Sequence, residues 1–501
     1  MTQQSKISKN IIANVAGRIW AFLSIFLFVP IYIKLMGVEA YGVITFYTVL
    51  LTFLAFADAG FSATLNREFA RESPFDNYKK NLLVTFEKIY IALALIVIIG
   101  TWIFAEQIAR SFMDAKDISL EQLTYYVRLM GISIGLYFFS TLYQGGLMGL
   151  QQQVKANVLS ISYNATKAGL VIVPLFFCPT LELYFYWQIG VTLMYLVVNR
   201  FFVAKVLGGL KIAKTHFEYV KPIWRYTVGM MALAIVYAAN TQIDKLTVGS
   251  LLPLSDFGYY FMASSVSQVS LLLATPIGMA IFPELSRLVS VSDKDRISEL
   301  FKRFSYIIAT IVSIVVFVLF AYCYDYIAIW QHDAQIAAYI TPATRVLLIG
   351  FLFMGLQLMP YYLALANGYT RINVVLGLCS IGFIIPSMDY FVTHYGFIGA
   401  SYPWLMINSV IALILAAVVI RKFLRGWFVN WLFTNTLLPI MATAIVTAGL
   451  WFGSTFLQQG FYTLIYGAII GLISLFANLR IYIYLYPDIK NNNIYKKIFR
   501  K

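Results

Sequence analysis

Residues 304–321 read FSYIIATIVSIVVFVLFA, an uncharged run long enough to cross the hydrocarbon core of a bilayer as a single helix. Similar apolar runs recur from one end of the chain to the other, and no polar stretch between them could form a soluble domain. The 501 residues are 60% hydrophobic and only 12% charged, whereas an average globular chain is about 25% charged. We therefore predict an all-α, polytopic membrane protein with no globular appendage.

The apolar runs predict about fourteen transmembrane helices, and the loops between them alternate in charge. Basic loops, such as 67–80, 205–221 and 287–303, alternate with loops that are acidic or nearly uncharged, such as 114–121. Short basic loops stay in the cytoplasm, so we expect both termini on the cytoplasmic side of the membrane. The expected spans are 11–34, 41–65, 82–106, 123–147, 154–177, 181–206, 224–248, 257–283, 304–330, 342–366, 372–394, 396–420, 430–456 and 461–486.

The two halves of the chain resemble each other at an offset of about 216 residues. LMGVEAYG at 35–42 aligns with LLPLSDFG at 251–258, and KANV at 155–158 aligns with RINV at 371–374. Glu68 and Arg71 align with Glu284 and Arg287, while Arg128 falls one residue out of register with Arg345.

Six helices in each repeat would give the halves the same orientation, with their symmetry axis along the membrane normal. We expect a six-helix bundle at 1–215, a second at 216–425, and two extra helices with a basic tail at 426–501. The duplication could serve stability alone. In membrane proteins, paired bundles usually also form a central site and alternate its access between the two sides.

Cationic and polar side chains interrupt several spans at membrane depth, where such groups generally face a bundle interior or a wet cavity. Lys167 lies near the middle of the span 154–177, and Asn164 belongs to the same polar stripe. Asn14 and Arg18 share one face of the first span because they are four residues apart. A mid-span lysine without an obvious adjacent acid indicates an anion or a wet cavity.

Arg128 and Arg345 lie toward the outer ends of their spans. Arginine suits phosphate because its planar guanidinium donates two parallel hydrogen bonds, and lysine acts as a point charge. Both arginines could instead extend to the outer interface. The buried charges are more often basic than acidic, which favours an anion-binding cavity and argues against an exporter of cations.

Two acidic residues also fall within spans. Asp244 is followed directly by Lys245, and Asp58 lies in the inner third of the second span. Asp244 and Lys245 could form a structural pair, and Asp58 could cap or pair locally near the end of its helix.

Several classes of protein are disfavoured by what the sequence lacks. The net charge of +15 is concentrated at helix ends, which indicates membrane topology and not nucleic-acid binding. There is no GxxxxGK[ST], HExxH or CxxC motif, and the three histidines are far apart. We therefore expect neither an enzyme nor a metal or organic cofactor.

The segment from Leu35 to Arg71 resembles the polysaccharide flippases of the Wzx type. In that family L-G-x-x-x-Y/F-G joins the first two helices and D-x-G lies near the end of the second. The matching residues here are Leu35, Gly37, Tyr41, Gly42, Asp58 and Gly60, with Met36 inserted after the leucine. The likeness extends through length and span count to a larger group that includes multidrug exporters and peptidoglycan lipid flippases.

The resemblance implies transport of an undecaprenyl-pyrophosphate-linked oligosaccharide from the inner to the outer leaflet, with its lipid tail among the membrane lipids. It implies that Arg18 and Lys167 hold the pyrophosphate, that Arg128 and Arg345 assist further out, and that a proton or sodium gradient drives the cycle. Asp244 or Asp58 would be the coupling carboxylate. The product would enter O-antigen, capsule or exopolysaccharide synthesis, with a polymerase and chain-length protein as possible partners. The alternatives are a multidrug or cation antiporter of the same fold and a membrane glycan polymerase or ligase.

Overall fold

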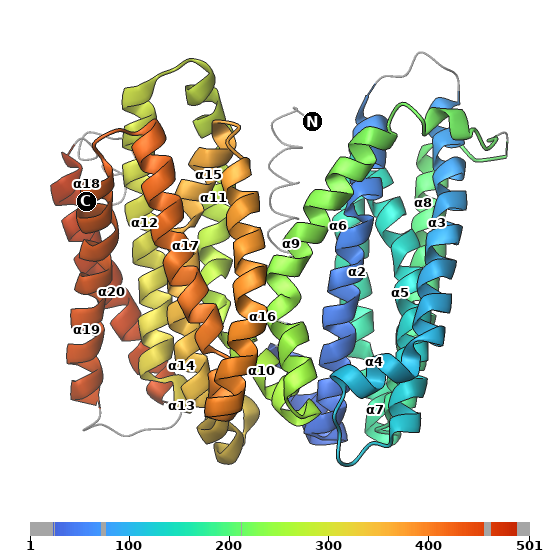
Figure 1. The fold of residues 1–501 in the computed structure, drawn as a ribbon, viewed down its shortest axis with the longest axis horizontal. Helices are drawn as coiled ribbons and strands as arrows, with labels where there is room; N and C mark the ends of the chain where they lie inside the picture. The colour runs from blue at the N-terminus through green and yellow to red at the C-terminus, as the bar shows by residue number, and fades with distance from the viewer. Residues whose placement is uncertain (1–23, 25, 72–76, 212, 455–461, 488–501) are drawn as a thin grey trace, which may run out of the picture. The chain divides into compact units, whose positions relative to one another are not determined.

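The computed structural model describes residue 24 and residues 26–71, 77–211, 213–454 and 462–487, and within them every regular element is a helix (Figure 1). Ten of these helices are long and apolar enough to cross a membrane. Each predicted span from 41–65 onward coincides with one helix or with consecutive helices. The prediction of a polytopic all-α membrane protein is therefore confirmed, while the count of fourteen crossings stays a prediction.

The chain forms two compact units, residues 1–259 and 260–501. The predicted boundaries at 215/216 and 425/426 concern equivalence in sequence and stay predictions. In the first unit, a short helix at Phe26–Met36 comes before the labelled helices. They are α2 (Val38–Ala70), α3 (Tyr78–Ile103), α4 (Ala105–Phe112), α5 (Leu120–Gly149), α6 (Gln153–Asn164), the π-helix η1 (Ala165–Leu170), α7 (Ile172–Phe177), α8 (Leu181–Val206), the 3₁₀ turn η2 (Phe217–Tyr219) and α9 (Trp224–Leu251).

Helices α2 and α5 form the centre of the first unit. Helix α2 packs against both α5 and α9, and α5 packs in addition against α3 and α8. Helix α5 begins at a capping box, in which Ser119 and Gln122 each satisfy a backbone amide of the other. The long helices run side by side in Figure 1, with short α4 at the end where α9 finishes.

In the second unit, α12 is the central helix, in contact with α11, α14, α19 and α20. Helix α10 (Leu254–Ser267) spans the division between the units. The remaining helices are α11 (Val269–Ser290), α12 (Lys294–Ala321), α13 (Cys323–Gln331), α14 (Ala334–Leu356), α15 (Leu358–Ala366), α16 (Arg371–Gly399), α17 (Tyr402–Phe423), α18 (Phe428–Asn430), the π-helix η3 (Trp431–Leu437), α19 (Leu438–Ser454) and α20 (Tyr462–Leu485).

Large apolar side chains cover the outward faces of several helices. Ile96 and Ile103 on α3 and Leu472 on α20 are each more than 60% exposed. A soluble protein rarely exposes apolar surface on this scale, so these faces meet lipid.

Hydrogen bonds between side chains tie α19 and α20 to α12. Asn478 of α20 donates to the Thr443 hydroxyl of α19 at 2.9 Å, and Ser313 of α12 donates to the same oxygen at 3.1 Å. Tyr306 of α12 donates to Asn478 Oδ1 at 3.2 Å. Apolar association is weak between helices in lipid, so such polar contacts help to fix which helices pair.

Residues that align between the two halves of the sequence have similar local environments in the structure. The pairs Glu68–Arg71 and Glu284–Arg287 are both ion pairs between residues three apart, at 3.7 Å and 2.6 Å. Short helices α4 and α13 each follow the third helix of their repeat, α3 and α12.

Gly42 and Gly258, which align in the repeat, lie against each other. A methyl group on Gly258 would lie 3.5 Å from Gly42 Cα, and one on Gly42 would lie only 2.3 Å from the Leu254 carbonyl oxygen. The start of α2 can approach the start of α10 this closely only because residue 42 has no side chain.

Candidate functional site

Lys167 lies in the π-helical turn η1, which interrupts the fifth predicted span. Two residues of the local sequence accompany the wider turn. Pro174 has no N–H to continue the helical hydrogen bonding, and Gly169 lets the Phe28 ring approach to 2.9 Å of the position where a Cβ would be. Single π-turns inside helices often occur at functional sites.

Three tyrosine rings surround the Lys167 ammonium group. Its Nζ lies 4.9 Å from the ring centroid of Tyr47, 5.9 Å from that of Tyr137 and 5.6 Å from that of Tyr163. It also donates a hydrogen bond of 3.2 Å to the Tyr47 hydroxyl, which is 2.7 Å from the Ser133 hydroxyl. The rings come from α2, α5 and α6, so three helices build this tyrosine cage around one cation.

The tyrosine cage orients the lysine but leaves its charge in place. An aromatic face attracts a cation through its quadrupole and carries no net charge. Within the described part of the chain, no carboxylate oxygen lies within 4.0 Å of Lys167 Nζ. The cage therefore presents a cation, and its role as an anion site stays a prediction.

Side chains from α8 and from the first helix bind the backbone of η1. Trp187 Nε1 donates to the Thr166 carbonyl at 3.0 Å, and Gln188 Nε2 donates to the Lys167 carbonyl at 3.2 Å. The Tyr32 hydroxyl donates to the next carbonyl, that of Ala168. Three consecutive carbonyls of the turn thus accept bonds from outside their own helix.

Sequence analysis missed the cage tyrosines and both α8 donors. Of these residues, only Gln188 could have been found from the sequence, because an amide within the apolar span 181–206 needs a hydrogen-bond partner. In the structure Gln188 is fully buried. The tyrosines carried no such signal, since 35 tyrosines are spread along the chain.

The other predicted cavity residues are placed differently. Asn164 is the last residue of α6 and half-buried, one turn before Lys167. Asn14 and Arg18 lie outside the described residues, as does the side chain of Asp58. The structure therefore brings Asn164 and Lys167 together on one turn of helix.

Arg128 and Arg345 occupy equivalent positions in the two repeats. Arg128 is exposed, and its guanidinium lies 5.8 Å from the ring of Trp102, the second-last residue of α3. Arg345 lies 5.3 Å from the ring of Phe320, the second-last residue of α12, and donates to the Phe320 carbonyl at 3.1 Å. A cation at a helix C-terminus stabilises that end, so these contacts give both arginines a structural role beside the predicted one.

Asp244 and Lys245 are buried together in α9. Lys245 Nζ lies 3.5 Å from Asp244 Oδ1 and 3.2 Å from the Thr241 carbonyl oxygen, to which it donates. Both side chains are about 5% exposed. The pairing matches the structural alternative considered from the sequence, and a coupling role for Asp244 stays a prediction.

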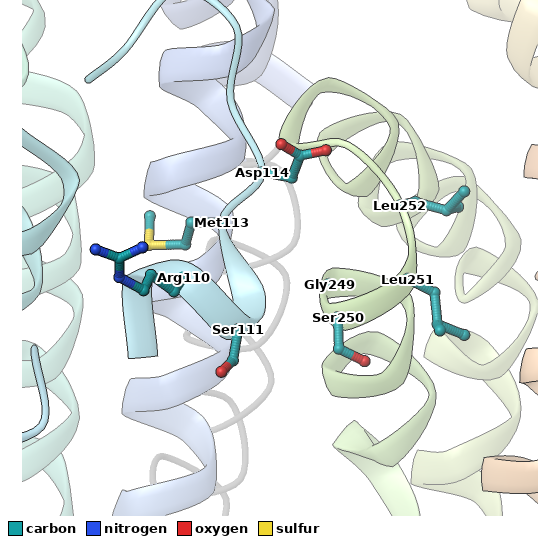
Figure 2. A pocket seen from close by; sticks show the side chains of 8 residues that line it. All are labelled: Arg110, Ser111, Met113, Asp114, Gly249, Ser250, Leu251 and Leu252. Atoms are coloured by element: carbon teal, nitrogen blue, oxygen red, sulfur yellow. The ribbon is translucent and has the colours of Figure 1, made fainter. Parts of the chain in front are cut away.

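A small polar cavity of about 80 Å³ lies between the ends of α4 and α9 (Figure 2). Its lining is Arg110, Ser111, Met113, Asp114 and the segment 249–252. None of the predicted site residues lines this cavity.

Fold and site together define a multi-pass helical membrane protein with a cation held inside the bundle. Residues 7–289 match the family described as polysaccharide biosynthesis protein, and the chain belongs to that family. A relative in Shigella flexneri, named "Putative O-antigen transporter", is 21% identical over 403 residues, which cover 80% of this chain and 91% of the relative.

Solved structures confirm the fold. The lipid II flippase MurJ in an inward closed conformation aligns with a TM-score of 0.70 at 15% identity, covering 96% of this chain and 99% of that one. An inward-facing multidrug resistance transporter of the MATE family aligns with a TM-score of 0.64 at 16% identity, covering 83% and 94%. At these identities the likeness concerns the fold, and it agrees with the group to which the segment 35–71 pointed.

Proposed function

We propose that the protein is a flippase for lipid-linked oligosaccharides, which carries undecaprenyl-pyrophosphate-linked repeat units from the cytoplasmic to the periplasmic leaflet of a bacterial inner membrane. The observation that carries the proposal is the Lys167 ammonium, held among three tyrosines with no carboxylate at ion-pair distance in the described part of the chain. Membership of a polysaccharide biosynthesis family and a relative named as an O-antigen transporter supply the substrate class.

Lys167 would attract the pyrophosphate as the substrate enters the bundle. A cation inside a low-dielectric bundle attracts a phosphate more strongly than one in water, and lysine serves as a point charge for it. The cage tyrosines offer flat apolar faces with hydroxyl groups beside them, a combination that suits a sugar ring. Arg18, Asn14 and Asn164 would extend this anion site, while Arg128 and Arg345 would act further out.

Translocation would follow alternating access between the two repeats, driven by a proton or sodium gradient. Asp58 is the stronger candidate for the coupling carboxylate, because Asp244 already pairs with Lys245. Both termini would lie in the cytoplasm. A polysaccharide polymerase and a chain-length protein would take over the product, and the flippase itself would form or break no covalent bond.

A cation antiporter of the same fold is the second candidate, favoured by the MATE-family structural likeness. Its cavity would need an acidic group to receive a cationic drug. The cage instead presents a cation, so the anionic substrate is favoured over the drug.

The test is the substitution Lys167→Met in a strain that depends on this gene for its surface glycan. We expect loss of glycan display at normal protein level, with lipid-linked repeat units accumulating in the inner leaflet. Lys155→Met is the matched control, because Lys155 is an exposed lysine on the same span, and it should leave display unchanged.

Each rival function predicts a different result. Wild-type display in Lys167→Met would refute the assignment of the cage as the anion site. In the gene knockout, accumulation in the outer leaflet would indicate a polymerase, and normal glycan with new drug sensitivity would indicate an antiporter.

A further inference from the structure

The turn from α17 to α18 lies at one end of the second unit (Figure 1). Several basic residues belong to this turn or to the helix beside it. Helix α12 supplies Lys302 and Arg303, and the sequence RKFLRGWF at 421–428 supplies the others. We call this set the α17–α18 patch; its members are Lys302, Arg303, Arg421, Lys422 and Arg425.

Aromatic rings hold three of these cations in position. Lys302 Nζ lies 2.9 Å from the ring centroid of Trp427, and the Arg421 guanidinium lies 5.2 Å from that of the adjacent Phe428. Lys422 Nζ lies 3.5 Å from the ring of Tyr369. Neighbouring rings thus bring cations from α12 and α17 to one place.

The turn itself is anchored on the core of the unit. Leu424 is buried, and Gly426 has a φ of 82°, a conformation that favours glycine. Just beyond the turn, Trp431 Nε1 donates to the Ser305 hydroxyl of α12 at 3.2 Å. The turn that carries the basic residues is therefore packed against the core of the second unit.

Almost no acidic group offsets this charge. Glu299 forms an ion pair with Arg303, but no carboxylate in the described part of the chain lies within 4.0 Å of the other four cations. The sequence contains neither Asp nor Glu from residue 390 to residue 487. Because aromatic rings order cations without neutralising them, the patch is an anion-attracting surface.

Apolar side chains next to the patch point to a lipid. Val429 and Phe433, one and two turns past the basic turn, are about 60% exposed. Trp427 has the amphipathic ring that favours the membrane interface. Cations at headgroup level beside exposed apolar surface match a molecule with a phosphate at one end and acyl chains at the other.

We propose that the α17–α18 patch binds the phosphate headgroup of an anionic phospholipid of the surrounding membrane, with the acyl chains lying along Val429 and Phe433. The site lies within the second unit and is separate from the Lys167 cage. This proposal does not depend on which molecule the protein transports, so it would stand even if the proposed flippase function failed.

The experiment titrates the purified full-length protein in detergent with phosphatidylglycerol or with phosphatidylcholine, and counts bound lipids by native mass spectrometry. The patch variant is Lys302→Gln, Arg421→Gln and Lys422→Gln together. We expect its affinity for phosphatidylglycerol to fall about tenfold or more, because each basic residue near a membrane surface adds to the attraction of anionic lipid.

The matched control is Lys294→Gln, Arg296→Gln and Arg371→Gln, which removes the same charge from exposed positions of the same unit. It should bind as the wild type does, and so should Lys302→Arg with Lys422→Arg. If the patch variant does not fold, Arg425→Gln alone should still weaken binding by about threefold.

Three outcomes would overturn the proposal. The patch variants could bind phosphatidylglycerol as the wild type does, or phosphatidylcholine could bind equally well. Inorganic phosphate could also raise the thermal unfolding midpoint as much as phosphatidylglycerol does, which would make the patch a site for free anions.

Discussion

The π-turn that carries Lys167 should depend on two side chains of α8 that never touch its ammonium group. Trp187 and Gln188 donate to consecutive carbonyls of η1. Trp187→Phe removes the indole N–H but keeps an aromatic ring, and Gln188→Leu removes the amide at similar volume. We predict that both substitutions allow the turn to change its conformation and so displace Lys167 from the cage.

The effects on stability should differ between the two variants. Trp187→Phe removes the donor to the half-buried Thr166 carbonyl, at a cost of about 1–3 kcal/mol in unfolding free energy. Gln188→Leu likewise removes the donor to the Lys167 carbonyl, at a similar cost of about 1–3 kcal/mol. It also removes a buried Oε1 that has no hydrogen-bond partner in the described part of the chain, so these terms nearly cancel and stability should hardly change.

The effects on function should be similar. A charge-assisted hydrogen bond from Lys167 to phosphate contributes about 1.5–3 kcal/mol, and losing its alignment should weaken substrate binding by roughly ten- to a hundredfold. The assay is binding of undecaprenyl pyrophosphate to purified protein, together with thermal unfolding of the same samples. Gln188→Leu is the sharper variant, because binding should fall while the unfolding midpoint stays near that of the wild type.

A double-mutant cycle decides whether the α8 donors act through Lys167. Coupled residues give non-additive effects, so Gln188→Leu should cause no further loss of binding in a Lys167→Met background. An equal loss in both backgrounds would refute the reasoning. If Lys167→Met itself leaves binding intact, the assignment of Lys167 to the anion site fails.

Three further predictions concern close packing, a hydrogen-bond network and an ion pair, and each is checked by thermal unfolding of the purified variants. Gly42→Ala should cost about 1–3 kcal/mol, because the new methyl group would lie 2.3 Å from the Leu254 carbonyl oxygen, whereas Gly258→Ala, with 3.3 Å to the Tyr41 ring, should be mild; equal costs would contradict the geometry. Asn478→Leu should cost about 1–2 kcal/mol by breaking its bonds to Thr443 and Tyr306, while Ser474→Ala removes a buried hydroxyl with no partner in the described residues and should be neutral. Glu87→Gln should cost about 1–3 kcal/mol, because Arg200 at 2.9 Å and Tyr143 at 2.7 Å both bind its shielded carboxylate. Glu106→Gln, in an exposed ion pair with Arg110, should cost less than about 0.5 kcal/mol. A larger cost for Glu106→Gln than for Glu87→Gln would contradict this account.

Sequence patterns predicted the helices well because hydrophobic length is a local property. Each predicted span from 41–65 onward meets a helix, and aligned residues such as Glu68 and Glu284 form the same ion pair with an arginine three positions later. Lys167 also stood out locally, since a cation in an apolar span needs a physical reason. The sequence could not reveal the π-turn, because its carbonyls are held by side chains from another helix.

The sequence by itself determined a polytopic helical membrane protein, and it predicted duplicated halves and a cation at membrane depth. Helix formation in lipid follows from the need to satisfy every backbone group within the segment, so a local apolar run decides it. Only the tertiary structure decided what surrounds that cation. Tyr47, Tyr137 and Tyr163 come from three helices, and whether their rings meet one ammonium group depends on how those helices pack, which no local pattern encodes.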